Sequence, residues 1–367
     1  MGLFSRGKPG LTEQQVLKAL ATVQEPELGG DLVARNMIKN IVIDGDQLRF
    51  AIELTTPACP LKDQIKAECE AALQSVAGIA PEQVEIEFTA QVRPRGGLLD
   101  KAAVPGVSHV IAVSAGKGGV GKSTVAVNLA VALAQEGARV GLLDADIYGP
   151  SVPLMLGVQG HQPEATVLED GQNAMIPIEA YGIKMISVGF LIDDRQPVIW
   201  RGPMVSQLLR QFLYQVAWAP LDYLIIDMPP GTGDIALTLA QSLQNVGLTG
   251  AVSVTTPQAV ATLDVVKSME MFRKVNVPLL GVIENMAYFV APDTGTRYDI
   301  FGQGGAARLA GQLGVPLLGQ IPIGMAVREG GDSGTPAVLS ERHDAYAAAF
   351  REIAGKLAAR VSVMEYA

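Results

Sequence analysis

The sequence has few of the residues that build disulfide frameworks and metal sites. It contains two cysteines, Cys59 and Cys69, and three histidines that lie far apart, His109, His161 and His343. Two cysteines cannot form a disulfide framework, and isolated histidines cannot form a histidine-rich metal site. Aromatic residues are also scarce, at 5% of the 367 residues, but hydrophobic residues make up 49%. This composition excludes a disordered chain and indicates a globular protein, with about two domains expected at this length.

Long apolar runs and an excess of basic charge are absent as well. Apolar runs such as residues 109–115 and 248–254 are much shorter than the ~20 residues that a membrane span needs. The N-terminus has no apolar region after its basic residues, and Arg6 stands where a myristoylation signal needs serine or threonine. Acidic residues outnumber basic ones, 37 against 28, which disfavours unspecific nucleic-acid binding. We therefore expect a cytoplasmic protein with neither a membrane nor a nucleic-acid partner.

Composition shifts predict two domains. Residues 1–92 are expected to form a small α+β domain, which a linker rich in proline and glycine, residues 93–107, separates from the rest. The first helix opens with a Thr-x-x-Gln capping box, and Asp44-Gly45-Asp46 predicts a hairpin between the first two strands. The predicted helices and strands of this domain are residues 12–21, 61–76, 38–43, 47–54 and 83–89.

The second predicted domain, residues 108–367, alternates short apolar strands with segments of helix length. This alternation predicts parallel β–α–β units and an α/β fold with a doubly wound, mostly parallel sheet. Residues 159–200 lack the pattern and are interpreted as an irregular insertion with a short hairpin. The predicted strands are residues 109–115, 138–143, 222–226, 248–254, 279–282 and 317–321.

The clearest chemical signal is a glycine-rich stretch between the first of these strands and a helix predicted at residues 123–136. In such a P-loop, glycines let backbone N–H groups turn toward phosphate oxygens, and the helix N-terminus adds positive potential. Lys122 is expected to reach the β- and γ-phosphates of ATP, and Ser123 is expected to ligate Mg²⁺. The predicted nucleotide-binding residues of the loop are Gly116, Lys117, Gly118, Gly119, Val120, Gly121, Lys122, Ser123 and Thr124.

Carboxylates follow two of the predicted strands. Asp227 ends one strand and leads into Met-Pro-Pro-Gly-Thr-Gly-Asp, and Asp144 and Asp146 follow another. We expect Asp144 and Asp227 to hold Mg²⁺, Asp146 to orient the attacking water, and the glycine-rich loop after Asp227 to act as switch II. The alternative for each carboxylate is that it only caps a turn.

Lys117, directly after the first glycine, gives the loop a deviant Walker A pattern that resembles the ATPase family of the nitrogenase iron protein, MinD and ParA. Within that family, the chain resembles the Mrp (ApbC-like) iron–sulfur cluster carriers over about residues 108–350. The segments that carry this resemblance are DADIYGPSVP, IWRGPMVSQLLRQF, LIIDMPPGTGD, and VIENMAYF with IFGQGG. The earlier segment LTTPACP, residues 54–60, resembles a loop of the small domain shared by iron–sulfur assembly factors.

The resemblance implies a homodimeric, Mg²⁺-dependent ATPase that binds iron–sulfur clusters and transfers them to apoprotein clients. It implies that Lys117 crosses the dimer interface to the partner's nucleotide. We therefore expect Lys117 to be catalytic, together with Lys122 of the P-loop and Asp146. It also implies that Asn285 and Pro322 flank the adenine. Arg201 matches a family motif, but the sequence assigns it no role.

One family feature is missing. Carriers of this family usually have Cys-x-x-Cys where this chain has Ala291 and Thr294. Clusters need thiolates, typically four, so Cys59 becomes the candidate cluster ligand. Because Pro60 follows it, Cys59 is expected at a helix N-cap, where the thiol pKa is lowered, and the alternative is a small buried hydrophobe. Cys69 lies on an apolar helix stripe and is expected in the core.

Two other functions stay open from the sequence. A positioning ATPase of the MinD or ParA kind would need a basic amphipathic C-terminal helix or a basic patch, and residues 345–367 are rich in alanine with mixed charge. A nucleotide-sensing scaffold would bind ATP but carry no cluster itself.

Overall fold

The computed structural model describes residues 11–93, 103–168, 171–191, 201–341 and 344–366. Its contacts divide the chain into two compact units, residues up to Val92 with Ser362–Ala367, and residues Arg93–Val361. Residues 94–102 of the predicted linker, and residues 192–200 of the predicted insertion, lie outside the described residues.

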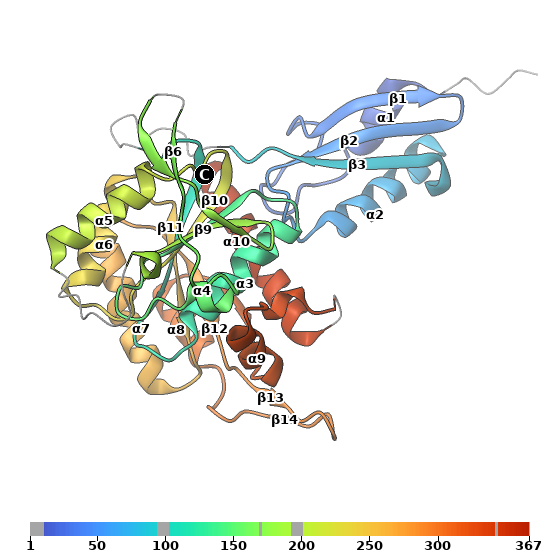
Figure 1. Cartoon of the computed structure of the whole chain (residues 1–367). Coiled ribbons are helices and arrows are strands. Elements are labelled where there is room, and N and C mark those ends of the chain that lie inside the picture. The colour runs from blue at the N-terminus through green and yellow to red at the C-terminus, as the bar shows by residue number, and fades with distance from the viewer. Residues whose placement is uncertain (1–10, 94–102, 169–170, 192–200, 342–343, 367) are drawn as a thin grey trace, which may run out of the picture. The chain divides into compact units, whose positions relative to one another are not determined.

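The first unit is a three-stranded sheet with two helices (Figure 1). Thr12 forms the predicted capping box with Gln15, and Asp44 pairs with Gln47 across the predicted hairpin turn, in which Gly45 has a φ of +61°. Strand β1 is antiparallel to β2, and β3 is parallel to it. The elements are α1 (Glu13–Leu20), β1 (Ile38–Asp44), β2 (Gln47–Leu54), α2 (Lys62–Ala72), which a π-helical turn (Leu73–Ala77) continues, and β3 (Val84–Ala90).

The second unit is built on an eight-stranded sheet with the order β15-β12-β11-β4-β10-β5-β9-β8. All six predicted strands are present in it, and every pairing is parallel except that of β8 with β9. The strands are β4 (Val107–Ala115), β5 (Val140–Asp144), β8 (Ile178–Ala180), β9 (Ile183–Ser187), β10 (Leu221–Asp227), β11 (Gly250–Thr255), β12 (Leu279–Glu284) and β15 (Leu317–Gln320).

The interpretation of residues 159–200 as an irregular insertion is wrong in part. The short hairpin is present as β6 (Ala165–Val167) and β7 (Asn173–Met175), but β8 and β9 belong to the main sheet. Strand β9 has only five residues, and Lys184 interrupts its apolar run, so it lacks the continuous hydrophobic pattern of the other parallel strands.

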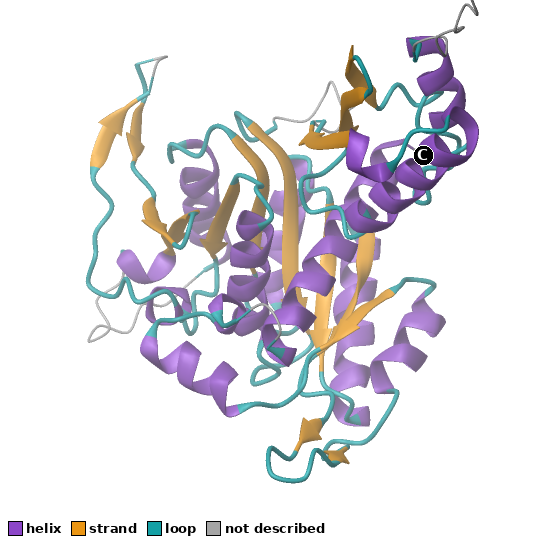
Figure 2. Ribbon diagram, turned by 90° about the vertical axis from the view of Figure 1, so that its right-hand side faces the viewer, coloured by secondary structure: helices purple, strands orange, loops and turns teal. Residues whose placement is uncertain are grey.

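Helices lie on both sides of this sheet (Figure 2). Val110 and Ala112 of β4 join a hydrophobic cluster with α5, α6, α7 and α8, whereas Ile111 and Val113 point to the opposite face, because side chains alternate along a strand. The fold class predicted from the sequence, α/β with a doubly wound sheet, is confirmed. The helices are α3 (Lys122–Gln135), α4 (Val152–Met155), α5 (Gly202–Tyr214), α6 (Asp234–Asn245), α7 (Ala259–Lys274), α8 (Gly305–Leu313), α9 (Met325–Ser333) and α10 (Ala345–Tyr366).

The strand order places a crevice where a ligand is expected. Strand β5 follows β4 in the chain but lies on one side of it, beyond β10, and β11 lies on the other side. Ligands of doubly wound sheets bind at the carboxyl ends of the strands where the order reverses in this way. Across the described residues, no helix is long and apolar enough to cross a membrane.

Candidate active site

The glycine-rich loop joins the carboxyl end of β4 to the N-terminus of α3. Gly119 and Gly121 both have a φ of +82°, a left-handed conformation that favours glycine. A Cβ on Gly116 would lie 2.3 Å from a backbone carbon of Asp264 in α7, so only glycine allows this close approach. The loop therefore has the backbone geometry that the P-loop prediction requires.

Lys122 is buried within a group of carboxylates. Its Nζ lies 2.7 Å from Asp227 Oδ1 and 3.3 Å from Asp146 Oδ2. Burial lowers the pKa of Lys122, but Asp227, Asp146 and Asp144 together outweigh this effect, and its pKa is raised. The ammonium group is therefore charged, and the predicted metal-binding and catalytic carboxylates surround it.

Asp144 and Asp227 lie side by side at the same register of β5 and β10, and both are fully buried. Burial and the neighbouring Asp227 raise the pKa of Asp144 to about 7, although Ser187 Oγ donates a hydrogen bond of 2.9 Å to its Oδ2. Burial also raises the pKa of Asp227, against the effect of Lys122. The sequence analysis did not predict Ser187 as a site residue. The only pattern that could have indicated it is a hydroxyl side chain at the end of the short strand β9.

The donor set suits Mg²⁺. Asp227 Oδ2 is buried without a hydrogen-bond partner among the described residues. Within that part of the chain, no three His, Cys, Asp or Glu side chains are arranged to hold a metal by themselves. Mg²⁺ typically takes one or two carboxylates and completes its shell with water and phosphate oxygens. Asp227, Asp144 and the Ser123 hydroxyl are oxygen donors of this kind.

Asn285 and Lys117 differ in how tightly they are held. Asn285 follows β12, is buried, and donates a hydrogen bond of 2.9 Å from Nδ2 to the Val120 carbonyl oxygen, so it braces the P-loop. Lys117 is half-exposed and has no hydrogen bond or ion pair with the described residues. Pro322 is buried two residues beyond β15, on the strand next to β12. Adenine contacts of Asn285 and Pro322 stay predictions.

Two protein families match the chain. Residues 106–358 match the NUBPL iron-transfer P-loop NTPases, and residues 13–86 match the iron–sulfur cluster assembly proteins. This chain belongs to the iron-transfer P-loop NTPase family. An iron–sulfur cluster carrier protein of Synechocystis sp. is 51% identical over 360 residues, covering 96% of this chain and 99% of the relative. The carrier protein of Escherichia coli is 42% identical over 353 residues, covering 96% and 93%.

Solved structures agree with this membership. A nucleotide-binding protein of Archaeoglobus fulgidus in complex with ADP is 37% identical, with a TM-score of 0.56, covering 66% of this chain and 92% of that protein. The cell division ATPase MinD of Pyrococcus furiosus is 26% identical, with a TM-score of 0.51, covering 68% and 97%. The resemblance seen in the sequence is confirmed. Membership of this family makes the protein an ATPase.

The N-cap position predicted for Cys59 is wrong. Helix α2 begins at Lys62 with Leu61 as its N-cap, so Cys59 precedes the helix by two more residues. Burial, with smaller contributions from Glu27 and Glu25, raises the pKa of Cys59 to about 11, although the Leu61 N–H acts in the opposite direction. The helix dipole does not produce a thiolate here. Cys69 is fully buried in the core of the first unit, as predicted.

The segment that aligns with the missing Cys-x-x-Cys is an exposed hairpin. Strands β13 (Phe289–Val290) and β14 (Arg297–Tyr298) pair antiparallel, and the Ala291 N–H donates to the Thr296 carbonyl oxygen at 2.9 Å. Thr294 is exposed in the turn. The hairpin therefore presents a methyl group and a hydroxyl where relatives are expected to present thiols.

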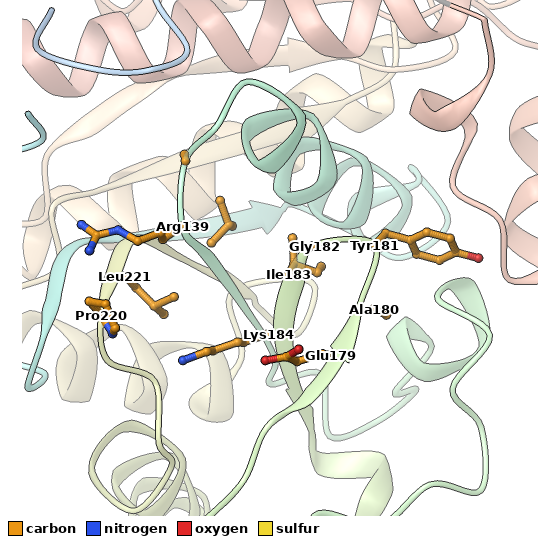
Figure 3. A pocket seen from close by; sticks show the side chains of 11 residues that line it. Arg139, Glu179, Ala180, Tyr181, Gly182, Ile183, Lys184, Pro220 and Leu221 are labelled. Carbon is orange, nitrogen blue, oxygen red and sulfur yellow. The ribbon is translucent and has the colours of Figure 1, made fainter. Parts of the chain in front are cut away.

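A pocket of about 480 Å³ lies at the amino ends of the strands, where β5, β9 and β10 begin (Figure 3). The P-loop follows the carboxyl end of β4, so the pocket is at the other end of the sheet. Arg139 on its wall is paired with Asp222, with Nη2 and Oδ1 2.5 Å apart. Lys184 donates to the carbonyl oxygens of three consecutive residues, 217–219. These cations are already partnered by the fold, so the pocket does not compete with the P-loop as a phosphate site.

Proposed function

We propose that this protein is an ATP-hydrolysing iron–sulfur cluster carrier, which takes clusters as cargo and transfers them to apoprotein clients. The observation that carries the proposal is the buried contact of Lys122 with Asp227 under a P-loop. This contact occurs in a chain that relatives named as cluster carriers match along almost their whole length. A cytoplasmic setting suits two free cysteines, because thiols stay reduced there.

ATP binding changes the partner of Lys122. The phosphates offer the ammonium group a second set of negative oxygens, so Lys122 can leave Asp227 for the nucleotide. Asp227, Asp144 and Ser123 are then free to hold Mg²⁺, which supplies neutralising charge for the phosphates when bound. Asp146, the nearly buried carboxylate that also contacts Lys122, positions the attacking water.

The ATPase acts as a homodimer in this proposal. Lys117 is half-exposed and unpartnered among the described residues, as a lysine that reaches a second copy would be. Hydrolysis then changes the fit between the two copies and does not drive chemistry on another substrate. This differs from a MinD-like positioning role, which would need a basic face on α10, because Glu352 and Glu365 lie among the basic residues of that helix and Glu352 pairs with Lys356 at 2.6 Å.

Cys59 is the proposed cluster ligand. The hairpin at Ala291 and Thr294 contributes no thiolate, and Cys69 is fully buried. Two copies of Cys59 supply two of the typical four ligands, so the others come from small thiols or from cysteines of the client. Because burial disfavours the thiolate, binding is expected to be weak and labile.

The second candidate function, a nucleotide-sensing scaffold without a cluster, is favoured by the same raised pKa of Cys59. Iron and sulfide analysis after anaerobic reconstitution separates the two. We expect the wild type to bind substoichiometric iron and sulfide, and Ala291→Cys with Thr294→Cys to bind a more stable cluster. If the wild type binds no iron under conditions in which the double variant does, the scaffold function replaces the carrier function.

A further inference from the structure

Arg201 is a charged residue that the nucleotide site does not use. It is the N-cap residue of α5, it is exposed, and among the described residues it has no hydrogen bond or ion pair. A positive charge at a helix N-terminus is unfavourable by roughly 0.3–1 kcal/mol, because it faces the positive end of the helix dipole. The stability of α5 therefore does not explain an arginine at this position.

Two contacts show how α5 lies against α6. A Cβ on Gly202 would lie 3.4 Å from Thr238 Oγ1, and one turn further along both helices Ser206 Oγ and Ser242 Oγ are 3.2 Å apart. The two helices therefore run in the same direction, with the N-terminus of α5 beside the end of the first turn of α6. Their ribbons are neighbours in Figure 1. This register places Arg201 beside the first turn of α6.

The first turn of α6 directly follows the loop predicted as switch II. The Gly231 N–H donates to the Ala115 carbonyl oxygen at 2.8 Å, so this loop lies against the end of β4 where the P-loop begins. Asp234 is the first residue of α6, is exposed, and has no side-chain partner among the described residues. It lies about 6 Å, slightly more than one turn, before Thr238 along α6. Two opposite charges thus stand unpaired at adjoining helix ends beside the switch loop.

We infer that Arg201 is a positioning residue for ATP hydrolysis, which pairs with Asp234 and so holds switch II in its hydrolytic conformation. The inference rests on the ATP hydrolysis proposed above. Because α6 follows the loop directly, any shift of the loop changes the distance between the two charges. An exposed ion pair contributes only about 0–1 kcal/mol, which is enough to bias a loop between two conformations but too little to determine the fold.

A double-mutant cycle on the full chain tests the pair. The variants are Arg201→Gln, Asp234→Asn and their combination, with Arg201→Lys as the conservative variant, and kcat and KM for ATP are measured for each. The matched control is Arg210→Gln, because Arg210 is also exposed on α5 but about 13 Å further along the helix. Thermal unfolding of every variant shows whether the fold is retained.

We expect each glutamine or asparagine variant to lose about fivefold in kcat at unchanged KM, as an exposed ion pair allows. The combination should lose no more than the worse single variant, because both residues act through one interaction. Arg201→Lys should keep most of kcat, and Arg210→Gln should match the wild type. An Arg201→Gln variant with wild-type kcat, or a combination whose loss is the product of the single losses, would overturn the inference. A wild type without ATP turnover would instead contradict the proposed function.

Discussion

The nucleotide site and the loop around Cys59 both bury a reactive group, but their electrostatic surroundings are opposite. Lys122 is buried next to Asp227 and Asp146, so its charge is offset by nearby carboxylates. Cys59 is buried next to Glu25 and Glu27, whose negative charges add to the effect of burial and keep the thiol protonated. The lysine is therefore ready to exchange one anion for another, whereas the thiol stays unreactive until its surroundings change.

The largest effect is expected from removing the cation of the nucleotide site. Lys122→Ala should lower ATP turnover by about 10³-fold and weaken nucleotide binding, because the charge that stabilises the phosphates is lost. It also leaves Asp227 and Asp146 buried without their cation, which should destabilise the fold by about 3 kcal/mol. Steady-state turnover and thermal unfolding measure both effects. Turnover equal to that of the wild type would contradict the P-loop assignment.

The two sites also show what a sequence can predict. The glycines, Lys122 and Asp227 were found because a P-loop is a local pattern between a strand and a helix, and parallel strands bring their carboxyl ends together. The position of Cys59 was missed because it depends on where α2 begins, and Leu61 takes the N-cap although Pro60 precedes it. Ser187 was missed because β9 is short and Lys184 interrupts its apolar run, so the strand that places Ser187 beside Asp144 was not predicted.

A second prediction concerns Lys117, the lysine of the nucleotide site that has no partner within the described residues. Lys117→Ala should keep nucleotide binding but lose turnover by about 10²-fold, since the missing charge belongs to the partner's site. An equal mixture of Lys117→Ala and Asp146→Asn chains should recover about a quarter of wild-type turnover, because half of the dimers are mixed and each has one intact composite site. Absence of recovery, with mixed dimers confirmed by mass spectrometry, would count against action across the interface.

A third prediction sharpens the role of the thiol. Cys59→Ala should abolish the iron–sulfur absorbance of reconstituted protein while ATP turnover persists, because the two functions use different units of the chain. Cys69→Ala is the matched control, since Cys69 is the other cysteine and lies fully buried in the core. It should keep the absorbance at a somewhat lower thermal stability. Equal cluster binding by the two variants would remove Cys59 from the cluster site.

A fourth prediction concerns the pH dependence of Cys59 itself. Because its pKa is raised from 9.0 to about 11, alkylation of the cluster-free Cys69→Ala variant should be about 100-fold slower at pH 8 than that of a free thiol, and should rise about tenfold per pH unit until it levels near pH 11. The same raised pKa also makes the free energy of unfolding depend on pH. The folded state binds the proton more tightly than the unfolded state, so this contribution is fully present below about pH 9 and is lost as the pH rises toward about 11. Iodoacetamide labelling followed by mass spectrometry measures the rate at each pH. A midpoint at or below pH 8 would restore the thiolate that the sequence predicted, and the electrostatic contrast between the two sites would disappear.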